Sequence, residues 1–246
     1  LRTPLTAIRG YAETLLEQGQ ADREEARKFL EIIHRHADRL GRLLNDLLDL
    51  SNIELERAPL SIRPISLADV TRQAAAMLSP QAEQKSIHLV TAVPAELPAV
   101  MADRDRLVQI LVNLIDNAVK YTLEGGQVEV TAQKLNGSGS PLTGSPQLIL
   151  PPGDQSMATE RDFIEVAIKD TGIGIPRKDL PRITERFYRV DKARSREMGG
   201  TGLGLAIVKH LVQAHGGTLV IESELGKGTD VRFTLPVASA LLGSTG

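Results

Sequence analysis

The chain has 246 residues, of which 41% are hydrophobic and only 3% aromatic, so its core must be built from aliphatic side chains. Its 29 Lys and Arg residues and 31 Asp and Glu residues give a net charge of −2. This balance lacks the basic excess of nucleic-acid-binding proteins, and the absence of Cys excludes disulfides and Cys-ligated metal. Its apolar runs are shorter than the ~20 residues that cross a bilayer. We therefore expect a cytoplasmic piece without a membrane anchor of its own.

Residues 1–57 predict a helical hairpin. Apolar residues recur at steps of three and four over residues 1–18 and again over residues 22–56, separated by Gly19 and the candidate N-cap Asp22. The stripe of the longer segment comprises Leu30, Ile33, Ala37, Leu40, Leu44 and Leu47, with Leu43 and Leu50 at its flanks. Because a lone hairpin leaves much of this stripe exposed, we expect two copies to form a four-helix bundle as a homodimer.

An α/β domain is expected over residues 66–237, after a linker at 58–65 that contains Pro59 and Pro64. Ser66, with Asp69 three residues on, predicts a capped helix start. The pattern then predicts strands near 87–93, 127–134, 163–169, 217–223 and 228–236, and helices near 103–121 and 203–215.

Two segments of this part of the chain fall outside the predicted core. Residues 135–162 are rich in Gly, Pro and Ser and predict a flexible insertion, with a partner-binding loop as the alternative. Residues 238–246 read as a loose tail.

The predicted helix at 103–121 combines an apolar face with a polar one. Asn113 and Asn117 lie four residues apart, and Lys120 and Tyr121 follow one turn later. Amide oxygens suit a hard cation such as Mg²⁺, a Lys can bind phosphate, and a Tyr ring can pack against a base. The alternative is an ordinary polar surface. The apolar face consists of Leu107, Ile110, Leu111, Leu114 and Ala118.

Two Gly-rich segments follow predicted strands. In "DTGIGIP" (170–176), Asp170 can accept a hydrogen bond from an exocyclic amine, and Gly172 and Gly174 allow close approach to a flat base. Taken alone, this segment could equally be a plain turn. In "GGTGLGLAIVKHLVQAHGG" (199–217), glycines precede a helix whose N-terminus can bind phosphates. A dinucleotide fingerprint is excluded, because such a motif belongs between the first strand and helix of a βαβ unit.

Residues 183–200, between the two Gly-rich segments, predict a lid. Phe187 and Tyr188 could pack or release, and the alternative for the charged residues is a solvated loop. The basic side chains that could meet phosphate oxygens are Arg189, Lys192, Arg194 and Arg196. The five His residues show no metal-binding spacing and read as surface or partly buried residues.

Together these segments resemble the catalytic core of bacterial two-component sensor histidine kinases. "NLIDNAVKYT" is similar to the N box, "DTGIGIP" to the first G box, "ERFYRVD" to the F box and "GGTGLGLAIVKHLVQAHGG" to the second G box. "LRTPLTAIRGYAETLLE" resembles the H box and first helix of the dimerisation hairpin. The amino-acid sequence of residues 185–217 is most similar to that of phosphate-regulon sensor kinases.

The resemblance implies an α+β fold: a helical hairpin that forms a four-helix bundle as a dimer, followed by a Bergerat-type two-layer α/β sandwich. It implies ATP and Mg²⁺ as cofactors, with Asn117 on Mg²⁺ and Asn113 as a possible second ligand. Lys120 would contact phosphates, Tyr121 would pack by the nucleotide, and Asp170 would bind the adenine amine. Gly172 and Gly174 would shape the base pocket. The phosphate region would be formed by Arg189, Gly200, Thr201, Gly202, Leu203 and Gly204.

The implied chemistry is transfer of the γ-phosphoryl group of ATP to a His, then to an Asp in the receiver domain of a response regulator. Asn113 stands where ATP-hydrolysing relatives of this fold carry a Glu general base, which favours a protein acceptor over water. Two alternatives stay open: a non-catalytic ATP-binding and dimerisation scaffold, and an ATP-hydrolysing relative of the same fold.

The family's H box reads His-Glu-Leu-Arg-Thr-Pro-Leu, and this chain begins at its Leu. We therefore expect the chain to lack the acceptor His, to bind Mg-ATP, to dimerise weakly and not to phosphorylate itself. His34 and His36 lack the surrounding motif. Thr3 occupies the position that the family uses to place water for dephosphorylating the regulator; an ordinary helical Thr is the alternative. The parent protein is expected to be anchored in the bacterial plasma membrane by upstream segments.

Overall fold

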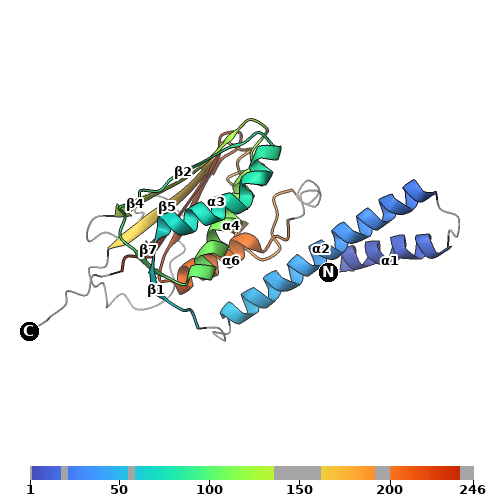
Figure 1. Ribbon diagram of the computed structural model, residues 1–246, viewed down its shortest axis with the longest axis horizontal. Coiled ribbons are helices and arrows are strands. Elements are labelled where there is room, and N and C mark those ends of the chain that lie inside the picture. The colour runs from blue at the N-terminus through green and yellow to red at the C-terminus, as the bar shows by residue number, and fades with distance from the viewer. Residues whose placement is uncertain (1, 18–21, 55–58, 136–161, 192–199, 239–246) are drawn as a thin grey trace, which may run out of the picture.

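The computed structural model of the chain describes residues 2–17, 22–54, 59–135, 162–191 and 200–238. Helices α1 (Arg2–Glu17) and α2 (Arg23–Glu54) form the predicted antiparallel hairpin at one end of the molecule (Figure 1). The rings of Tyr11 and Phe29 pack between them with centroids 5.4 Å apart. Asp22 accepts the first helical hydrogen bond of α2, from the Ala26 N–H, as its predicted capping place requires.

The burial of the hairpin leucines differs from the pattern expected from the stripe alone. Leu43 and Leu50, at the predicted flanks, are only 8% and 1% exposed, whereas Leu30 and Leu44 in the stripe are 58% and 50% exposed. The reason is that the C-terminal half of α2 contacts helix α6 (Gly204–Ala214) of the second domain and joins its core. One face of α2 is therefore occupied within the chain, and another is left exposed.

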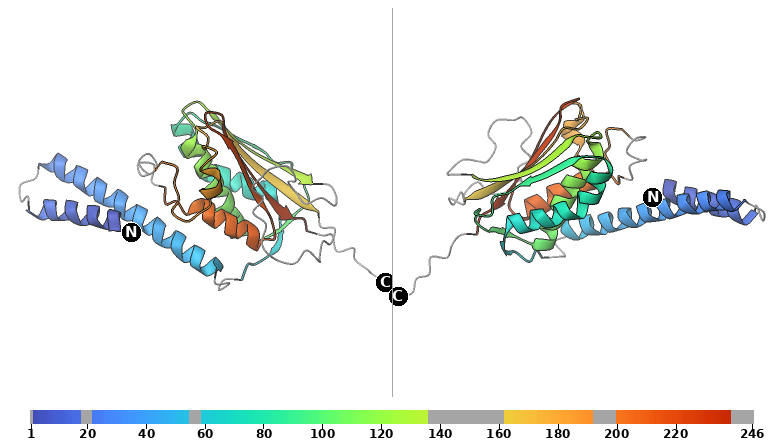
Figure 2. Two further views of the ribbon diagram at one scale, coloured as in Figure 1. Left: turned by 180° about the vertical axis from the view of Figure 1, so that it is seen from behind. Right: turned by 45° about the horizontal axis from the view of Figure 1, so that its top comes forward.

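The second part of the chain is a two-layer α/β sandwich, as the fold class predicted. Its five-stranded sheet has the order β2-β4-β5-β7-β6, in which β2 and β4 are parallel and all other neighbours antiparallel. Helices α3, α4 and α6 lie together on one face of this sheet (Figures 1 and 2). The elements are α3 (Leu67–Gln84), β2 (His88–Ala92), α4 (Arg104–Tyr121), β4 (Gln127–Leu135), β5 (Phe163–Asp170), α6 (Gly204–Ala214), β6 (Leu219–Glu224) and β7 (Gly228–Pro236).

The core between the helices and the sheet is aliphatic, as the composition requires. The predicted inner face of α4 is buried throughout, and so are Leu67, Val70, Ala74 and Leu78 of α3. Both helices start at side-chain caps. Ser66 Oγ accepts from the Asp69 N–H, and Asp103 Oδ1 accepts from the N–H groups of Asp105 and Arg106.

The expected linker at 58–65 is partly structured, so it ends at residue 62 rather than at residue 65. Residues Arg63–Ile65 form strand β1, which pairs antiparallel with β3 (Val100–Ala102), a strand that the sequence pattern did not reveal. Pro64 is tolerated because this two-stranded sheet has open edges that need no donor from it. The Ser61 N–H donates to Asp103 Oδ2 at 2.9 Å, so the chain is fixed to the domain before β1 begins.

Two further expected segments lie mostly outside the described residues. These are 136–161 of the insertion and 239–246 of the tail. Lys134 and Asp162, on either side of the insertion, form an ion pair at 2.5 Å. The Ala238 N–H donates to the Ala99 carbonyl, which places the first tail residue with the sheet. Among the described helices, none combines the length and apolarity needed to cross a bilayer.

Candidate nucleotide-binding site

A cavity of about 320 Å³ lies between α4, the two Gly-rich segments and the sheet. Its lining residues come from segments that are far apart in sequence and that the fold brings together. The predicted site residues that line it are Asn113, Asn117, Lys120, Tyr121, Asp170, Gly174, Arg189, Gly200, Thr201, Gly202 and Gly204. One cavity thus collects the polar face of α4 and both Gly-rich segments.

Two predicted site residues, Gly172 and Leu203, do not line the cavity. Gly172 lies behind it, where a Cβ would stand only 2.5 Å from the Tyr121 carbonyl oxygen. The Leu203 side chain belongs to the hydrophobic core, and its N–H donates to Thr201 Oγ1 at 3.3 Å. Thr3 is part of α1, but its side chain falls outside what the structure describes.

Asp170 closes one end of the cavity and is only 7% exposed. Its Oδ1 accepts from the Gly172 N–H at 2.8 Å and from the Thr229 N–H at 3.2 Å. Burial raises the pKa of Asp170, while these two hydrogen bonds favour the ionised form. Because both bonds go to Oδ1, Oδ2 remains to accept a hydrogen bond from a ligand in the cavity.

The first Gly-rich segment is held against the end of α4. The Ile173 N–H donates to the Tyr121 carbonyl at 3.1 Å, and the Ile173 carbonyl accepts from the Gly226 N–H at 2.8 Å. Gly174 has φ = +67°, and a Cβ there would lie 2.1 Å from the Glu224 carbonyl oxygen. Only glycine fits this close approach of two backbones.

The second Gly-rich segment leads into the N-terminus of α6. Gly202 has φ = +76°, and its carbonyl accepts from the Phe187 N–H at 2.8 Å. A Cβ on Gly204 would lie 2.9 Å from Asn113 Oδ1, so the start of α6 touches the polar face of α4. The free N–H groups of this first turn, together with the helix dipole, favour an anion such as phosphate.

The polar face of α4 offers amide oxygens and one ammonium group to the cavity. The Asn113 side chain donates from Nδ2 to the Gln109 carbonyl at 3.0 Å, which leaves its Oδ1 as an acceptor. Lys120 Nζ forms an ion pair with Asp116 Oδ2 at 2.5 Å, so a phosphate would compete with Asp116 for it. Within the described part of the chain, no group of three His, Cys, Asp or Glu side chains could hold a metal ion. Neutral amide oxygens completed by triphosphate oxygens do suit Mg²⁺.

The described part of the predicted lid is anchored through Tyr188, which lines the cavity. Its hydroxyl donates to Asp179 Oδ1 at 2.6 Å, and the Arg182 guanidinium lies 4.3 Å from its ring centroid. This hydrogen bond raises the pKa of Tyr188. The predicted phosphate-binding residues Lys192, Arg194 and Arg196 lie outside the described residues.

The apolar lining of the cavity was not among the predicted site residues. This lining includes Ile168, Ile183, Ile221, Leu225 and Val231. On β7, Val231 stands between Asp230 and Arg232, and this alternation is typical of any half-buried strand. Alternation does not distinguish a residue that faces a ligand from one that faces a helix.

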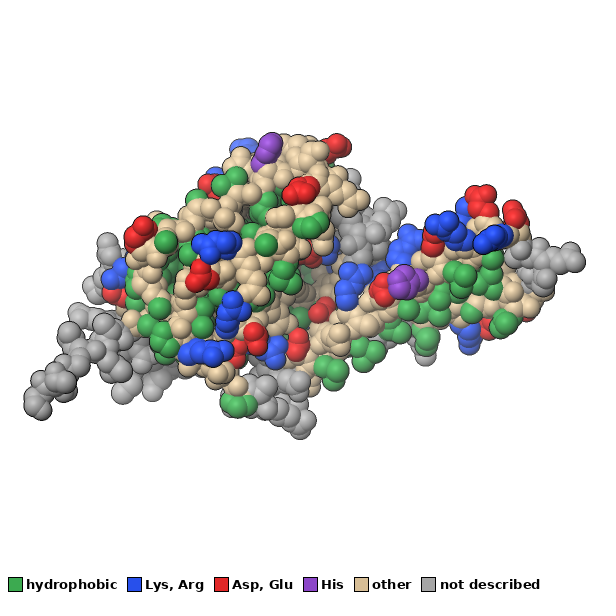
Figure 3. Space-filling model, viewed as in Figure 1, with side chains coloured by type: hydrophobic (Ala, Val, Ile, Leu, Met, Phe, Trp, Pro, Cys, Tyr) green, Lys and Arg blue, Asp and Glu red, His purple; other side chains and the backbone are tan. Residues whose placement is uncertain are grey.

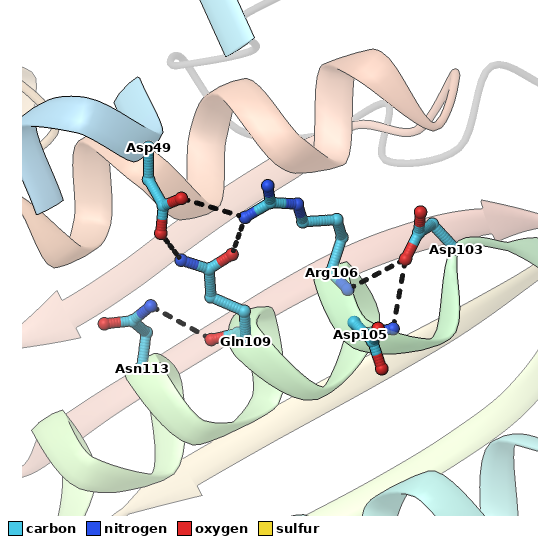
Figure 4. Close-up of polar contacts among 6 residues, drawn as sticks. All are labelled: Asp49, Asp103, Asp105, Arg106, Gln109 and Asn113. Atoms are coloured by element: carbon cyan, nitrogen blue, oxygen red, sulfur yellow. Dashed lines mark hydrogen bonds and ion pairs between the residues drawn. The ribbon is translucent and has the colours of Figure 1, made fainter. Parts of the chain in front are cut away.

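Helix α2 of the hairpin also reaches this region (Figure 4). Asp49 accepts from Arg106 Nη1 at 3.2 Å and from Gln109 Nε2 at 2.8 Å, and Arg106 donates to Gln109 Oε1 at 2.8 Å. Gln109 in turn accepts from Asn113 through its backbone carbonyl. A chain of hydrogen bonds therefore leads from the hairpin to a residue of the cavity.

Two further contacts join α2 to the second Gly-rich segment. Arg39 Nη2 lies 3.5 Å from the Gly200 carbonyl oxygen, and Asp46 forms a side-chain hydrogen bond with Thr201. Burial raises the pKa of Asp46, and the bond to Thr201 opposes that shift. No motif marks Arg39, Asp46 or Asp49, because they are ordinary charged positions on an amphipathic helix.

Comparison with known proteins places the chain among its relatives. The family described as "Histidine kinase-, DNA gyrase B-, and HSP90-like ATPase" matches residues 102–239, and "His Kinase A (phospho-acceptor) domain" matches residues 1–56. The chain belongs to the sensor histidine kinase family. Within this family, Sensor histidine kinase WalK of Bacillus subtilis (strain 168) is 37% identical over 236 residues, 96% of this chain and 35% of that protein.

Other members of the kinase family agree in sequence or fold. Drug sensory protein A of Synechocystis sp. is 37% identical over 98% of this chain and 34% of that protein. The structure of full-length ShkA in complex with AMPPNP is 32% identical, with a TM-score of 0.65 over 97% of this chain and 44% of that one. ThkA, solved with the response regulator protein TrrA, shares the fold with a TM-score of 0.68 at 22% identity, over 96% of this chain and 58% of that one.

These matches also show how much of its relatives' length the chain covers. It covers about a third of the length of the two curated relatives named above, 35% and 34%. The expected likeness to phosphate-regulon sensor kinases in particular stays a prediction.

Proposed function

We propose that the chain is the catalytic core of an ATP-dependent protein-histidine kinase. It binds Mg-ATP and transfers the γ-phosphoryl group to a His of the dimerisation hairpin, from which the group passes to an Asp of a response regulator. The observation that carries this proposal is the single cavity that combines Asp170, the Asn-bearing face of α4 and the N-terminus of α6. The AMPPNP bound by the related ShkA supports a nucleotide in this cavity.

The cavity suits ATP in a defined orientation. Asp170 Oδ2 accepts from the adenine amine, while the apolar side chains from the sheet and the Tyr121 ring contact the flat faces of the base. The phosphates then extend toward Gly200, Gly202 and the first turn of α6, where backbone N–H groups bind them. When bound by Asn117, Mg²⁺ neutralises charge on the phosphate oxygens.

The site supports transfer to a protein acceptor better than hydrolysis. Asn113 touches the start of α6, close to where the terminal phosphates extend, and its side-chain amide cannot take a proton from water. In phosphoryl transfer most of the rate acceleration comes from positioning and charge stabilisation, which backbone N–H groups, Lys120 and Arg189 supply here. The nucleophile is then the imidazole of an acceptor His, a residue that we expect the printed hairpin to lack.

The hairpin supports the proposal of a homodimer. Hydrophobic side chains run along it in the space-filling view (Figure 3). Its exposed large hydrophobic residues are Leu5, Leu16, Leu30, Leu44 and Leu48. Burying these side chains against a second copy would complete a four-helix bundle, and the receiver domain of the regulator would dock on that bundle.

Incubation with γ-labelled ATP tests the function. The chain as printed should bind ATP but take up no label, whereas a version extended upstream by His-Glu and the preceding helix should become labelled. Label on the printed chain would contradict the proposed place of the acceptor. ATP binding without label on the extended chain would favour the scaffold, and rapid ATP turnover without an acceptor would favour the hydrolysing relative.

A further inference from the structure

Helix α4 carries Asn113, Asn117, Lys120 and Tyr121, and its C-terminus lies beside the base end of the cavity. The last carbonyl groups of any α-helix lack partners within the helix and carry the negative end of its dipole. The Lys120 ammonium cannot satisfy them, because it pairs with Asp116. The C-terminus of α4 therefore needs a donor from another part of the chain.

Lys85 supplies that donor from the end of α3. Its ammonium group donates to the carbonyls of Val119 at 2.6 Å, Lys120 at 3.0 Å and Thr122 at 2.7 Å. An ammonium has three N–H bonds, so each is matched by one carbonyl. Lys85 is not among the residues that line the cavity, and its role is indirect.

The carbonyl that Lys85 leaves out is the one that the site uses. Tyr121 lies between Lys120 and Thr122, and its carbonyl accepts from the Ile173 N–H at 3.1 Å. The backbone at Gly172 packs so closely on this carbonyl that a Cβ would lie 2.5 Å from it. The bonds on either side thus direct the Tyr121 carbonyl toward the first Gly-rich segment.

The backbone around Lys85 supports its placement. The Lys85 N–H closes the C-terminus of α3 on Ala82, and its carbonyl accepts from the Gly125 N–H at 3.3 Å in the turn after α4. Lys85 therefore joins the ends of α3 and α4 through both its side chain and its backbone. Burial lowers the pKa of its ammonium, whose hydration the three carbonyls replace.

We infer that Lys85 is a positioning residue for nucleotide binding, which fixes the end of α4 so that Tyr121 and the segment 172–174 form the adenine end of the cavity. This inference rests on the proposed function, since it concerns the same cavity. It predicts a loss of affinity that ATP and ADP share, because Lys85 does not line the cavity and acts through the backbone at the end of α4.

The test compares Lys85→Met, which keeps the length of the side chain but removes its charge and donors, with Lys85→Arg. In Lys85→Met the dissociation constants for ATP and ADP should rise by the same factor, about tenfold, so that their ratio stays at the wild-type value. Lys85→Arg should recover most of the affinity, because it restores a charged donor. The matched control is Lys134→Met, which removes a half-exposed lysine that pairs with Asp162. Lys134 lies at the C-terminal end of β4 and, within the described part of the chain, makes no contact with α4 that resembles that of Lys85.

Hydrogen exchange distinguishes a local change at the end of α4 from a general destabilisation of the domain. The Ile173 amide should exchange faster in Lys85→Met, while core amides of β5 such as Val166 keep their wild-type protection. Wild-type affinity in folded Lys85→Met, or a changed ratio of ATP to ADP affinity, would overturn the inference. Failure of the wild-type chain to bind ATP would instead refute the proposed function, so the two outcomes are distinguishable.

Discussion

Asp170 is the residue whose chemistry depends most directly on burial. Its Oδ1 already accepts two backbone N–H groups, which an Asn side-chain oxygen could also accept. An Asn at this position would then turn its NH₂ group toward the cavity, where, on the proposed function, it would meet the adenine amine donor to donor. We therefore propose that the buried carboxylate serves binding rather than folding.

In Asp170→Asn we expect ATP affinity to fall by a factor of about 10 to 100, as when a polar group of a binding site loses its partner. The free energy of unfolding should stay the same or rise, because the substitution removes a buried charge whose pKa burial raises. Calorimetric titration and urea denaturation measure the two quantities. A parallel loss of affinity and stability would contradict this separation.

Asn117 should be distinguishable from Asn113 by its dependence on magnesium. Asn117→Ala removes the proposed Mg²⁺ ligand, so ATP binding should weaken about tenfold and respond little to added Mg²⁺. In Asn113→Ala, which removes the side chain bonded to Gln109, the response to Mg²⁺ should persist. Titration of ATP with and without EDTA checks this; an unchanged Mg²⁺ response in Asn117→Ala would argue against its role.

Among the elements, the turn at Gly174 is determined by the close approach of two backbones. Gly174 and Gly125 have similar φ values, +67° and +74°, but a Cβ at 174 meets the Glu224 carbonyl while a Cβ at 125 meets nothing within 4 Å. This pair separates backbone strain from steric contact.

We expect Gly125→Ala to lower the free energy of unfolding by about 1 kcal/mol, the cost of a left-handed conformation. Gly174→Ala should lower it by about 3 kcal/mol and also weaken ATP binding, because the turn must shift. Urea denaturation of both variants provides the measurement. An equal decrease in the free energy of unfolding of both variants would show that the contact with Glu224 does not affect stability.

Helices α4 and α6 are joined by a histidine that must be neutral. The Asp103 N–H donates to His215 Nε2 at 3.0 Å, so the ring proton lies on Nδ1, which donates to the Leu211 carbonyl at 2.7 Å. Burial is the largest influence and lowers the pKa of His215. In the unfolded chain the imidazole has its ordinary pKa of about 6.5.

The unfolded chain therefore binds more protons than the folded one just below pH 6.5, and stability should fall as the pH drops from about 7.5 to 5.5. In His215→Gln this slope should be smaller, and the part contributed by His210, whose pKa burial also lowers, should remain. Denaturation curves across this pH range measure the slope. An unchanged slope in His215→Gln would rule out that the neutral His215 imidazole stabilises the fold.

The sequence predicted the strong elements and the polar part of the cavity for physical reasons that act locally. The cap at Ser66 and the apolar face of α4 are signals within one turn or two of a helix. Strand β3 and the linker strand β1 were missed because each has three residues and forms only by pairing with the other. The lysine at 85 has no local signal at all, since its partners lie 34 to 37 residues away.

In the whole molecule, the hairpin and the α/β sandwich are connected by contacts that the sequence pattern could not indicate. The heptad-like stripe of α2 predicted a bundle seam, but which flank would be buried depends on the docking of α6. Leu50 is buried by that docking, and Asp49 beside it reaches Arg106 and Gln109.

Asp49→Ala should loosen this docking. The side chains of Arg106 and Asp49 are only 25% and 32% exposed, so we expect a coupling energy of about 1 kcal/mol in a double-mutant cycle with Arg106→Ala. Amides of α2 around Leu43 and Leu50 should exchange faster, while the β5 amides should not. Asp38→Ala, which removes an exposed carboxylate paired with His34, serves as the control. Unchanged exchange near Leu50 would indicate that apolar packing alone holds α2.

The hydrogen bond from the Ser61 N–H to Asp103 limits how far the sandwich can move relative to the hairpin. Only residues 55–58 separate the end of α2 from Pro59, where the described sandwich begins. A fully extended chain between Glu54 and Pro59 spans at most about 18 Å. Pro59 therefore stays within this distance of the last residue of α2. On the proposed function, the cavity would meet an acceptor imidazole elsewhere on the hairpin only by a swing about this short connection. In a dimer, the direction of that swing, rather than the length of the tether, would choose between the two hairpins.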